Sequence, residues 1–349
     1  MTLMRNLLSY SGLVTKLRTM QSQLLTDNDF RELAEIPSVP LAVAYLRQKP
    51  SYVETLAQLD NHNLHRGKIE KLLMNSVYKD FARIYRFANA KQRVFLDLYF
   101  KRYEIQIVKN CLNTILSQHG IDIDISLFKD FFDHHSKLDI DLLTKSTSSE
   151  EFINNLKGSE YYKPLSRMTH IENPSLFDYE IALDLYYFSL LWKRRARFLS
   201  KNDLATVTNS FGNQIDLLNL QWIYRSRKFY NMSSPAIYAL TIPVTYKLKK
   251  SDISALVEAE DDDSFNQALA NTYYGSHYPD LQPHTLEQMY SFILRKILRL
   301  ETARYPYSIA AVYRYLHTKE HEIQQVTIAL ECIRYELEPS NTLEHIFKY

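Results

Sequence analysis

The sequence predicts an all-α protein made of three similar helical units, and three observations support this prediction. An acidic residue followed by an aliphatic one recurs at Glu104-Ile105, Asp216-Leu217 and Glu322-Ile323. Behind each pair, apolar residues recur every three or four positions, which is the spacing of one face of an α-helix. Only 6 glycines occur among the 349 residues, and alternating β-branched runs are nearly absent, so tight-turn β architectures have little support.

A second landmark recurs in the same order along the chain. It is a leucine followed by a hydroxyl residue and tyrosine: Leu46 before Ser51-Tyr52, Leu156 before Ser159 and Tyr161-Tyr162, and Leu269 before Thr272 and Tyr273-Tyr274. Both landmarks have a period of roughly 110 residues, which is the usual size of a domain. The sequence therefore predicts three helical repeats, at residues 1–120, 121–245 and 246–349.

Helix signals divide the repeats further. Thr26 and Asp29 are expected to cap a helix together, because a hydroxyl and an acid three residues apart can satisfy the free N–H groups of a first turn. Long helices are expected over 68–89, 179–199 and 286–305, each followed by a helix with an apolar stripe. Shorter helices are expected over 127–132, 150–156, 251–256 and 263–269. Residues 235–243 are expected to form a connector, and Leu330 is expected to be buried within the third stripe.

Composition limits the possible functions. The net charge of +2 supplies no general attraction to nucleic acid or to anionic lipid. No apolar run approaches the roughly 20 residues that cross a bilayer, and the N-terminus lacks the apolar core of a signal peptide. Cys111 and Cys332 have no metal-type spacing and are expected to be reduced and buried. These observations favour a soluble, intracellular protein.

The recurring acids Glu104, Asp216 and Glu322 have two interpretations. Because their positions are equivalent in the repeat, they could share a functional role. The interpretation that we favour is structural: an acid in the first turn of a helix complements the helix dipole and the free N–H groups there.

The residues His317-Thr318-Lys319-Glu320-His321 match the H-x-x-E-H pattern of one class of zinc peptidase. Two histidines one helical turn apart could bind zinc, and a carboxylate could activate water. Such a site needs a further protein ligand, and nothing in the sequence marks one. His134-His135 and the pair His62 and His65 also lack cysteines or carboxylates at ligand spacing. We therefore expect no bound metal.

Other motifs offer no catalytic or cofactor site. The acidic stretch 258–263 contains no glycine for the turn of a calcium loop, so it is expected to link two helices. No dinucleotide fingerprint, phosphate-binding loop or nucleophile elbow occurs. Two basic clusters, 193–197 and 225–228, could bind nucleic acid, lipid headgroups or an acidic protein, although a solvated helix face is the commoner explanation.

Three segments resemble one protein family. The stripe at 319–337 resembles the terminal signature of the C subunit of bacterial and archaeal V/A-type ATPases, the family of the vacuolar ATPase d subunit. The stripe at 215–225 resembles the middle repeat of that family, and Leu24-Leu25-Thr26-Asp27 with the later Tyr45-Leu46 and Ser51-Tyr52 resembles its opening. The position of Asn219 is occupied by Ile107 in the first repeat and Gln325 in the third. Together these segments cover essentially the whole chain.

This resemblance implies a funnel-like protein of three helical domains around a pseudo-threefold axis. It implies a non-catalytic central-stalk connector that couples the rotating shaft to the membrane rotor ring for proton or sodium transport. The expected partners are the central-shaft subunits and the proteolipid subunits of the ring, on the cytoplasmic face of the membrane and without nucleic acid. The alternative is a helical-repeat adaptor for an unrelated protein, since triplicated helices also occur in many scaffolds.

Overall fold

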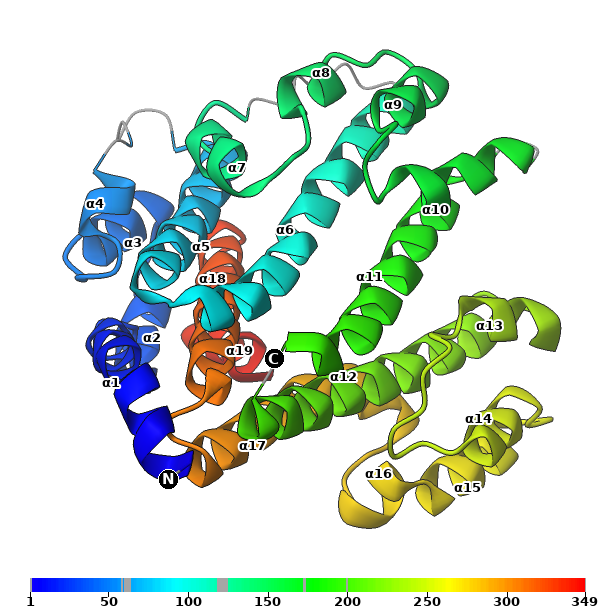
Figure 1. Ribbon diagram of the computed structural model, residues 1–349. Helices are drawn as coiled ribbons and strands as arrows, with labels where there is room; N and C mark the ends of the chain where they lie inside the picture. The colour runs from blue at the N-terminus through cyan, green and yellow to red at the C-terminus, as the bar shows by residue number, and fades with distance from the viewer. Residues whose placement is uncertain are drawn as a thin grey trace. The chain divides into compact units, whose positions relative to one another are not determined.

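The computed structural model describes residues 2–57, 59, 64–117, 125–171, 174–198 and 200–348 (Figure 1). Every regular element among these residues is a helix, which confirms the predicted all-α class. No helix in the described part of the chain has the length and apolar character needed to cross a membrane. The chain forms two compact units, one of Met1–Arg93 with Ser291–Tyr349 and one of Val94–Tyr290.

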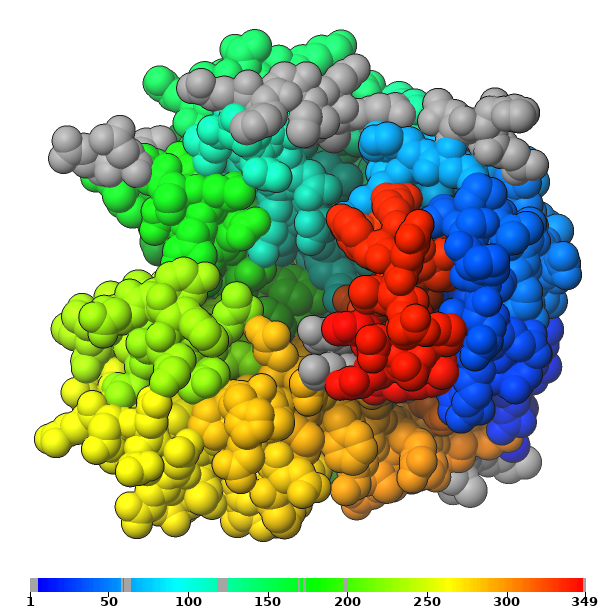
Figure 2. Space-filling model, turned by 180° about the vertical axis from the view of Figure 1, so that it is seen from behind, coloured from blue at the N-terminus to red at the C-terminus, as the bar shows by residue number. Residues whose placement is uncertain are grey.

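The first unit combines the two ends of the chain. Its N-terminal part contains α1 (Thr2–Gln21), α2 (Asp27–Ala34), α3 (Val39–Leu46), α4 (Val53–Leu56) and α5 (Arg66–Phe87). Its C-terminal part contains most of α17 (Leu286–Arg304), followed by α18 (Ile309–Arg334) and α19 (Pro339–Lys348). Helix α18 packs against α1, α2, α3 and α5, and α19 packs against α2. In Figure 2 the red C-terminal helices accordingly lie beside the blue N-terminal ones.

The second unit is built on three long helices. They are α6 (Ala90–Ser117), α11 (Leu176–Phe198) and α12 (Lys201–Lys228), and α11 packs along α12. Between α6 and α11 lie α7 (Lys129–His135), α8 (Ile140–Thr144), α9 (Ser149–Asn155), α10 (Tyr162–Ser166) and the short 3-10 helix η1 (Arg167–His170). After α12 come α13 (Ser234–Leu240), α14 (Lys250–Val257), α15 (Asp262–Asn271), α16 (Tyr273–His277) and η2 (Pro283–Thr285).

Polar caps fix where several helices begin. Thr26 accepts a hydrogen bond from the N–H of Asp29 at 3.2 Å, and the Asp29 carboxylate accepts one from the N–H of Thr26 at 2.7 Å. This is the predicted capping box of α2. The hydroxyl oxygens of Ser200 and Ser308 cap α12 and α18 by accepting the N–H groups of Asp203 and Ala310. Each cap satisfies an N–H group that the first turn of a helix leaves without a backbone partner.

The structure confirms most of the predicted helices. The expected long helices at 68–89, 179–199 and 286–305 correspond to α5, α11 and α17. The expected short ones correspond to α7, α9, α14 and α15. Of the landmark residues, Leu46, Leu156 and Leu269 are fully buried, as are Tyr52, Tyr161 and Tyr274.

Two local predictions were wrong. The recurring acids do not lie in the first turn of their helices, because α6, α12 and α18 begin at Ala90, Lys201 and Ile309, well before the acids. The residues upstream continue the same helix, so each acid lies near the middle of it. The connector at 235–243 contains a helix, α13, with Pro235 in its first turn, where proline costs no backbone hydrogen bond. The predicted repeat boundary at 120 and 121 lies outside the described residues.

Leu330 should contribute strongly to the stability of the first unit. Its side chain is 4% exposed on α18, as predicted from the apolar stripe. The substitution Leu330→Asp would place a carboxylate without a partner in this apolar contact, so we expect a loss of several kcal/mol, on the order of 2–7, in the free energy of unfolding. The matched control is Leu300→Asp, since Leu300 is 55% exposed on α17. Thermal and denaturant unfolding should separate the two variants, and equal midpoints would contradict burial of this face.

Candidate functional site

The three recurring acids are all buried inside the protein. Glu104 is 1% exposed in α6, Asp216 is 0% exposed in α12 and Glu322 is 3% exposed in α18. A carboxylate in such a place is costly unless hydrogen bonds or an opposite charge replace its lost hydration. The partners of each acid therefore decide what it does.

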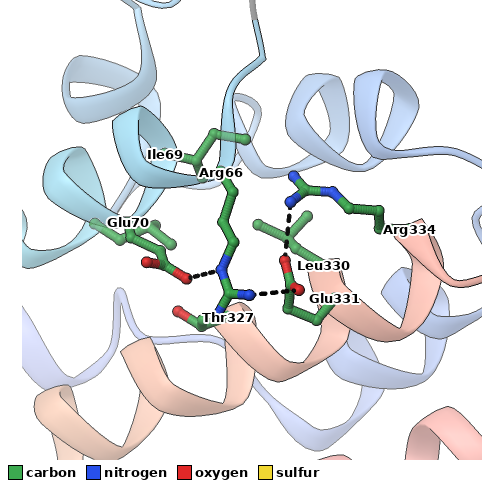
Figure 3. Close-up of a pocket in the computed structure, with 8 residues that line it drawn as sticks. Arg66, Ile69, Glu70, Thr327, Leu330, Glu331 and Arg334 are labelled. Atoms are coloured by element: carbon green, nitrogen blue, oxygen red, sulfur yellow. Dashed lines mark hydrogen bonds and ion pairs between the residues drawn. The ribbon is translucent and has the colours of Figure 1, made fainter. Parts of the chain in front are cut away.

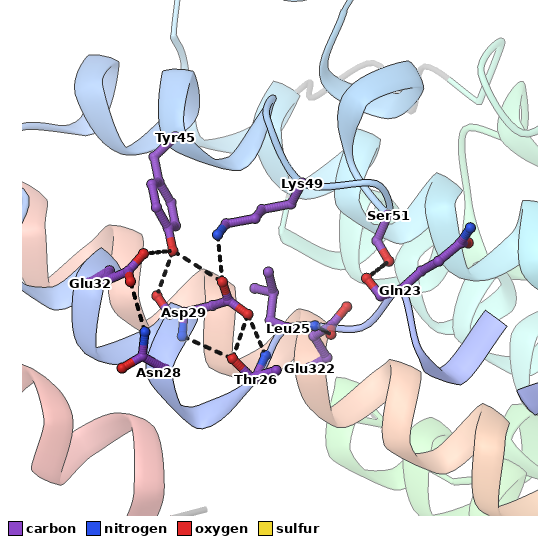
Figure 4. Close-up of polar contacts among 10 residues, drawn as sticks. All are labelled: Gln23, Leu25, Thr26, Asn28, Asp29, Glu32, Tyr45, Lys49, Ser51 and Glu322. Carbon is purple, nitrogen blue, oxygen red and sulfur yellow. Dashed lines mark hydrogen bonds and ion pairs between the residues drawn. The ribbon is translucent and has the colours of Figure 1, made fainter. Parts of the chain in front are cut away.

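Glu322 joins the two ends of the chain within the first unit. Its carboxylate accepts a hydrogen bond from the Tyr52 hydroxyl at 2.5 Å and another from the backbone N–H of Leu25 at 2.6 Å. Figure 4 shows Glu322 of α18 reaching the segment at Leu25. Lys319, one turn earlier in α18 and 1% exposed, forms an ion pair with the same carboxylate at 2.8 Å. Its ammonium group also lies 4.4 Å from the centre of the Tyr52 ring.

Glu104 has a similar set of partners in the second unit. It accepts a hydrogen bond from the Tyr161 hydroxyl at 2.6 Å and forms an ion pair with Lys101 at 2.5 Å. The Ser136 hydroxyl also donates to it at 2.5 Å, and this hydroxyl accepts the backbone N–H of Leu138 at 3.0 Å. The serine thus connects the backbone to the carboxylate through one additional hydrogen bond.

Asp216 is held mainly by backbone N–H groups. It accepts hydrogen bonds from the N–H groups of Tyr246 at 3.1 Å, Lys247 at 2.6 Å and Leu248 at 2.9 Å. The Tyr274 hydroxyl donates to the same carboxylate at 3.1 Å. These hydrogen bonds therefore hold residues 246–248, which precede α14, against α12.

The three clusters share one pattern, which we call the acid–tyrosine clasp. In each, a buried carboxylate in a long helix binds a buried tyrosine hydroxyl and the N–H of a leucine, directly or through Ser136. These leucines, Leu25, Leu138 and Leu248, each lie just before the cap residue of a short helix, namely α2, α8 and α14. The residue three positions before the acid also contacts the tyrosine: it is Lys101, Asn213 or Lys319.

Protonation keeps the tyrosines as hydrogen-bond donors. Burial, together with the neighbouring carboxylates, raises the pKa of Tyr52, Tyr161 and Tyr274 well above the usual range. Burial also raises the pKa of Asp216 above 3.8, against the lowering effect of its three N–H donors. Neutral, buried phenols bound to carboxylates are structural donors, so the clasps hold segments together and expose no nucleophile.

In two of the three long helices, the residue three positions after the acid forms a further buried hydrogen bond. The Asn219 amide forms two hydrogen bonds with the backbone of Ile242, at 2.8 and 3.1 Å. Gln325 donates to the carbonyl of Ile346 at 3.1 Å. The equivalent Ile107 is apolar and buried. The residue at this position therefore has a polar role in α12 and α18 but not in α6.

Gly212 is required by the same packing on α12. A methyl group at this position would lie 2.4 Å from the Tyr246 ring. The ring therefore lies flat against bare helix backbone, and the Tyr246 hydroxyl donates to the Asn209 side chain at 3.2 Å. Only glycine permits the segment that supplies N–H groups to Asp216 to approach α12 so closely.

The structure does not assemble a zinc site at the H-x-x-E-H segment. His317, Glu320 and His321 all lie within α18, and His321 is 6% exposed. Among the described residues, no group of three histidine, cysteine or acidic side chains is arranged to hold a metal ion. His62 lies outside the described residues. Cys111 and Cys332 are both free and buried, and burial raises the pKa of the Cys111 thiol to about 12.

Several residues of the basic clusters have partners within the chain, whereas Lys193 is exposed as expected for a solvated helix face. Arg194 pairs with Glu160 at 3.4 Å, and the Arg195 guanidinium stacks 3.5 Å from the centre of the Trp192 ring. In the second cluster, Arg227 donates to the carbonyls of Val257 and Ala259.

The remaining partners of the second basic cluster are acids. Arg225 pairs with Glu287 at 2.8 Å, and Lys228 pairs with Asp262 at 2.5 Å. Asp262 belongs to the acidic stretch 258–263, which connects α14 to α15 as predicted. Both ion pairs are partly exposed, so they neutralise most of this basic surface while contributing little to stability.

Ion pairs connect α5 with α18. Arg66 pairs with Glu70 at 2.7 Å and with Glu331 at 3.0 Å, and Arg334 pairs with Glu331 at 3.1 Å (Figure 3). The side chains leave a cavity of only about 10 Å³, too small for a ligand. This place is a contact between helices.

Comparison with known proteins identifies the family of this chain. The sequence model of the ATP synthase (C/AC39) subunit family matches residues 13–345. The chain therefore belongs to this family, the C subunits of V/A-type ATPases. The C subunit of the A-type ATP synthase of Pyrococcus horikoshii is 24% identical, covering 97% of this chain and 90% of its own length. The corresponding C subunit of Methanosphaera stadtmanae is 22% identical over 95% and 86%, and that of Archaeoglobus fulgidus is 23% identical over 93% and 92%.

Adjacent tyrosines offer a matched test of the clasp. Tyr161→Phe removes one donor from a buried carboxylate, so we expect the free energy of unfolding to fall by about 1–3 kcal/mol. Tyr162→Phe removes a hydroxyl from a partly exposed neighbour and should change stability by no more than about 0.5 kcal/mol. Tyr274→Phe and Tyr273→Phe repeat the comparison at Asp216. Equal losses from both members of a pair, measured by denaturant unfolding, would be incompatible with the clasp.

Asp29 should make stability dependent on acid pH. Burial would raise its pKa, but hydrogen bonds from Lys49 at 2.5 Å and from Thr26 outweigh this effect and lower the pKa from 3.8 to about 2 (Figure 4). Its stabilising contribution is therefore present above pH 3.8 and is lost as the pH falls through about 2. We expect Asp29→Asn to be less stable than the wild type near neutral pH and to approach it over this window. A stability difference that stays constant across the window would contradict this assignment.

Proposed function

We propose that this chain is the non-catalytic connector of the central stalk in a V/A-type rotary ATPase. In this role it couples the rotating shaft to the membrane rotor ring, so that ATP turnover and proton or sodium movement remain linked. Family membership over nearly the whole chain is the observation that carries the proposal. The partners are then the central-shaft subunits on one side and the proteolipid subunits of the ring on the other.

The clasps support the proposed arrangement of three repeats around a pseudo-threefold axis. The acid of the first predicted repeat binds the tyrosine of the second, and the acid of the second binds the tyrosine of the third. The acid of the third repeat binds Tyr52 of the first. Such a cyclic pattern of contacts is what a closed, funnel-like ring of three domains at 1–120, 121–245 and 246–349 requires.

A connector must transmit torque without yielding. Long helices joined by buried hydrogen bonds and close-packed aromatic rings suit that task, because well-packed interiors are nearly incompressible. In the second unit, for example, the Phe95 and Phe211 rings stack with centres 6.2 Å apart. The clasps favour a structural role for the three acids, because each acid is buried and bound by several groups of the same chain. The work of ATP hydrolysis then belongs to other subunits, and this chain is a peripheral part of the complex at the cytoplasmic face.

Reconstitution tests the proposed function. The complex is assembled with and without this subunit, and ATP hydrolysis and ion movement are measured in the same vesicles. We expect the soluble head to hydrolyse ATP without the subunit while ion movement is lost, and adding the purified chain should restore coupling. Full coupling in its absence, with no affinity for shaft or ring, would contradict the connector role and favour an adaptor for an unrelated protein.

A further inference from the structure

A large polar cavity opens directly over one of the three clasps. It has a volume of about 760 Å³ and lies within the second unit, between α6, the segment before α8 and the loop between α9 and α10. Buried Glu104 and Tyr161 form part of its wall. Lys101, Lys137, Lys157 and Arg194 line it, together with several acids.

The inner charges of this cavity are already balanced. Lys101 bridges Glu104 at 2.5 Å and Glu160 at 2.8 Å. The Glu160 carboxylate also accepts the Tyr186 hydroxyl at 2.8 Å and the Arg194 guanidinium at 3.4 Å. These carboxylates have little capacity left for a ligand.

Three cationic side chains of the cavity have hydrogen-bond donors available. Lys137 and Lys157 are exposed, and neither pairs with an acid among the residues that the structure describes. Arg194 is 43% exposed and makes one long contact, which leaves most of its five N–H donors available. Gly158, which also lines the cavity, adopts a φ of 87°, so a left-handed turn follows Lys157 in the chain. On the acidic side, Asp97 is exposed and also lines the cavity, and Asp139 caps α8 by accepting the N–H of Leu142 at 3.0 Å.

The clasp at Glu104 has an additional acid, Glu160, directly before its tyrosine. The residue before the clasp tyrosine is Glu160 here, but Ser51 and Tyr273 at the other two clasps. The other two clasps form without an acid at this position, so Glu160 and its ion pairs are not needed to form a clasp. A different ion cluster lies near the Glu322 clasp, where Arg83 pairs with Asp80 at 3.3 Å and with Glu54 at 3.5 Å and lines a polar cavity of about 310 Å³.

We propose that this cavity is the docking site for a carboxylate-rich protein segment, which inserts acidic side chains between Lys137, Lys157 and Arg194. This inference rests on the proposed function, in which the segment belongs to the foot of the central shaft. Charge complementarity argues for the occupant, because the cavity presents unpaired ammonium groups and a forked guanidinium that matches a carboxylate. The opening is large enough for several side chains and is too polar to attract an apolar helix.

Charge reversal in the intact protein tests the proposal. The variant Lys137→Glu with Lys157→Glu is compared with Lys163→Glu with Lys201→Glu, which alters two exposed lysines of the same unit outside the cavity. Binding to the purified shaft subunits is measured at several salt concentrations, with circular dichroism and thermal unfolding as checks of folding. We expect the cavity variant to bind roughly tenfold or more weakly and to lose most of the salt dependence, while the control keeps both.

Competition identifies the ligand chemistry. A polyglutamate peptide should displace the shaft from the wild type more effectively than inorganic phosphate at the same concentration of negative charge. If the wild type binds the shaft and the cavity variant binds it equally well, this inference is overturned, whereas the connector role is not affected. Equal competition by phosphate would also overturn it, in favour of a site for small anions. Failure of the wild type to bind either shaft or ring would instead contradict the proposed function itself.

Discussion

The fold depends on a buried carboxylate that is held at once by a tyrosine hydroxyl and by the backbone ahead of a short helix. A buried charge of this kind is strongly unfavourable when one of its partners is removed, so it forces the partners into one geometry. In the first unit this interaction is also what joins the chain ends, because Glu322 reaches Leu25 and Tyr52 across 297 and 270 residues. Loop closure over such distances is entropically costly, and the packing of α18 against α2, α3 and α5 must offset that cost together with the clasp.

The three clasps are chemically unequal, and the differences follow from local sequence. Two contain a lysine three residues before the acid, so that a cation compensates the carboxylate. The clasp at Asp216 has Asn213 in that place and relies on three N–H groups and the Tyr274 hydroxyl, while burial raises the pKa of this acid. Gly212 makes those N–H groups accessible by letting Tyr246 lie against α12. A single structural role is thus achieved with an ion pair in two clasps and with backbone dipoles in the other.

Local physics allowed much of the fold to be predicted from the sequence. Helical periodicity gave the long helices, and the spacing of Thr26 and Asp29 gave the cap of α2, since these depend only on neighbouring residues. The partners of the acids could not be predicted, because proximity between Tyr161 and Glu104 arises from tertiary packing and nothing local distinguishes Tyr161 from Tyr162. One signal for burial was present: Val108, Leu220 and Val326 each lie four residues after an acid, which places every acid on the apolar face of its helix. The charges around the cavity carry no periodicity and became recognisable only in three dimensions.

Amide hydrogen exchange of the native protein tests the central claim most directly. The N–H groups of Leu25 and Leu248 lie outside regular helix hydrogen bonding and are bound to buried carboxylates. The clasp therefore predicts that both exchange as slowly as the cores of α18 and α12, which open only when the surrounding unit unfolds. Exchange of these two N–H groups at the rate of an exposed loop, while the helices stay protected, would contradict the claim that the clasps hold the fold together.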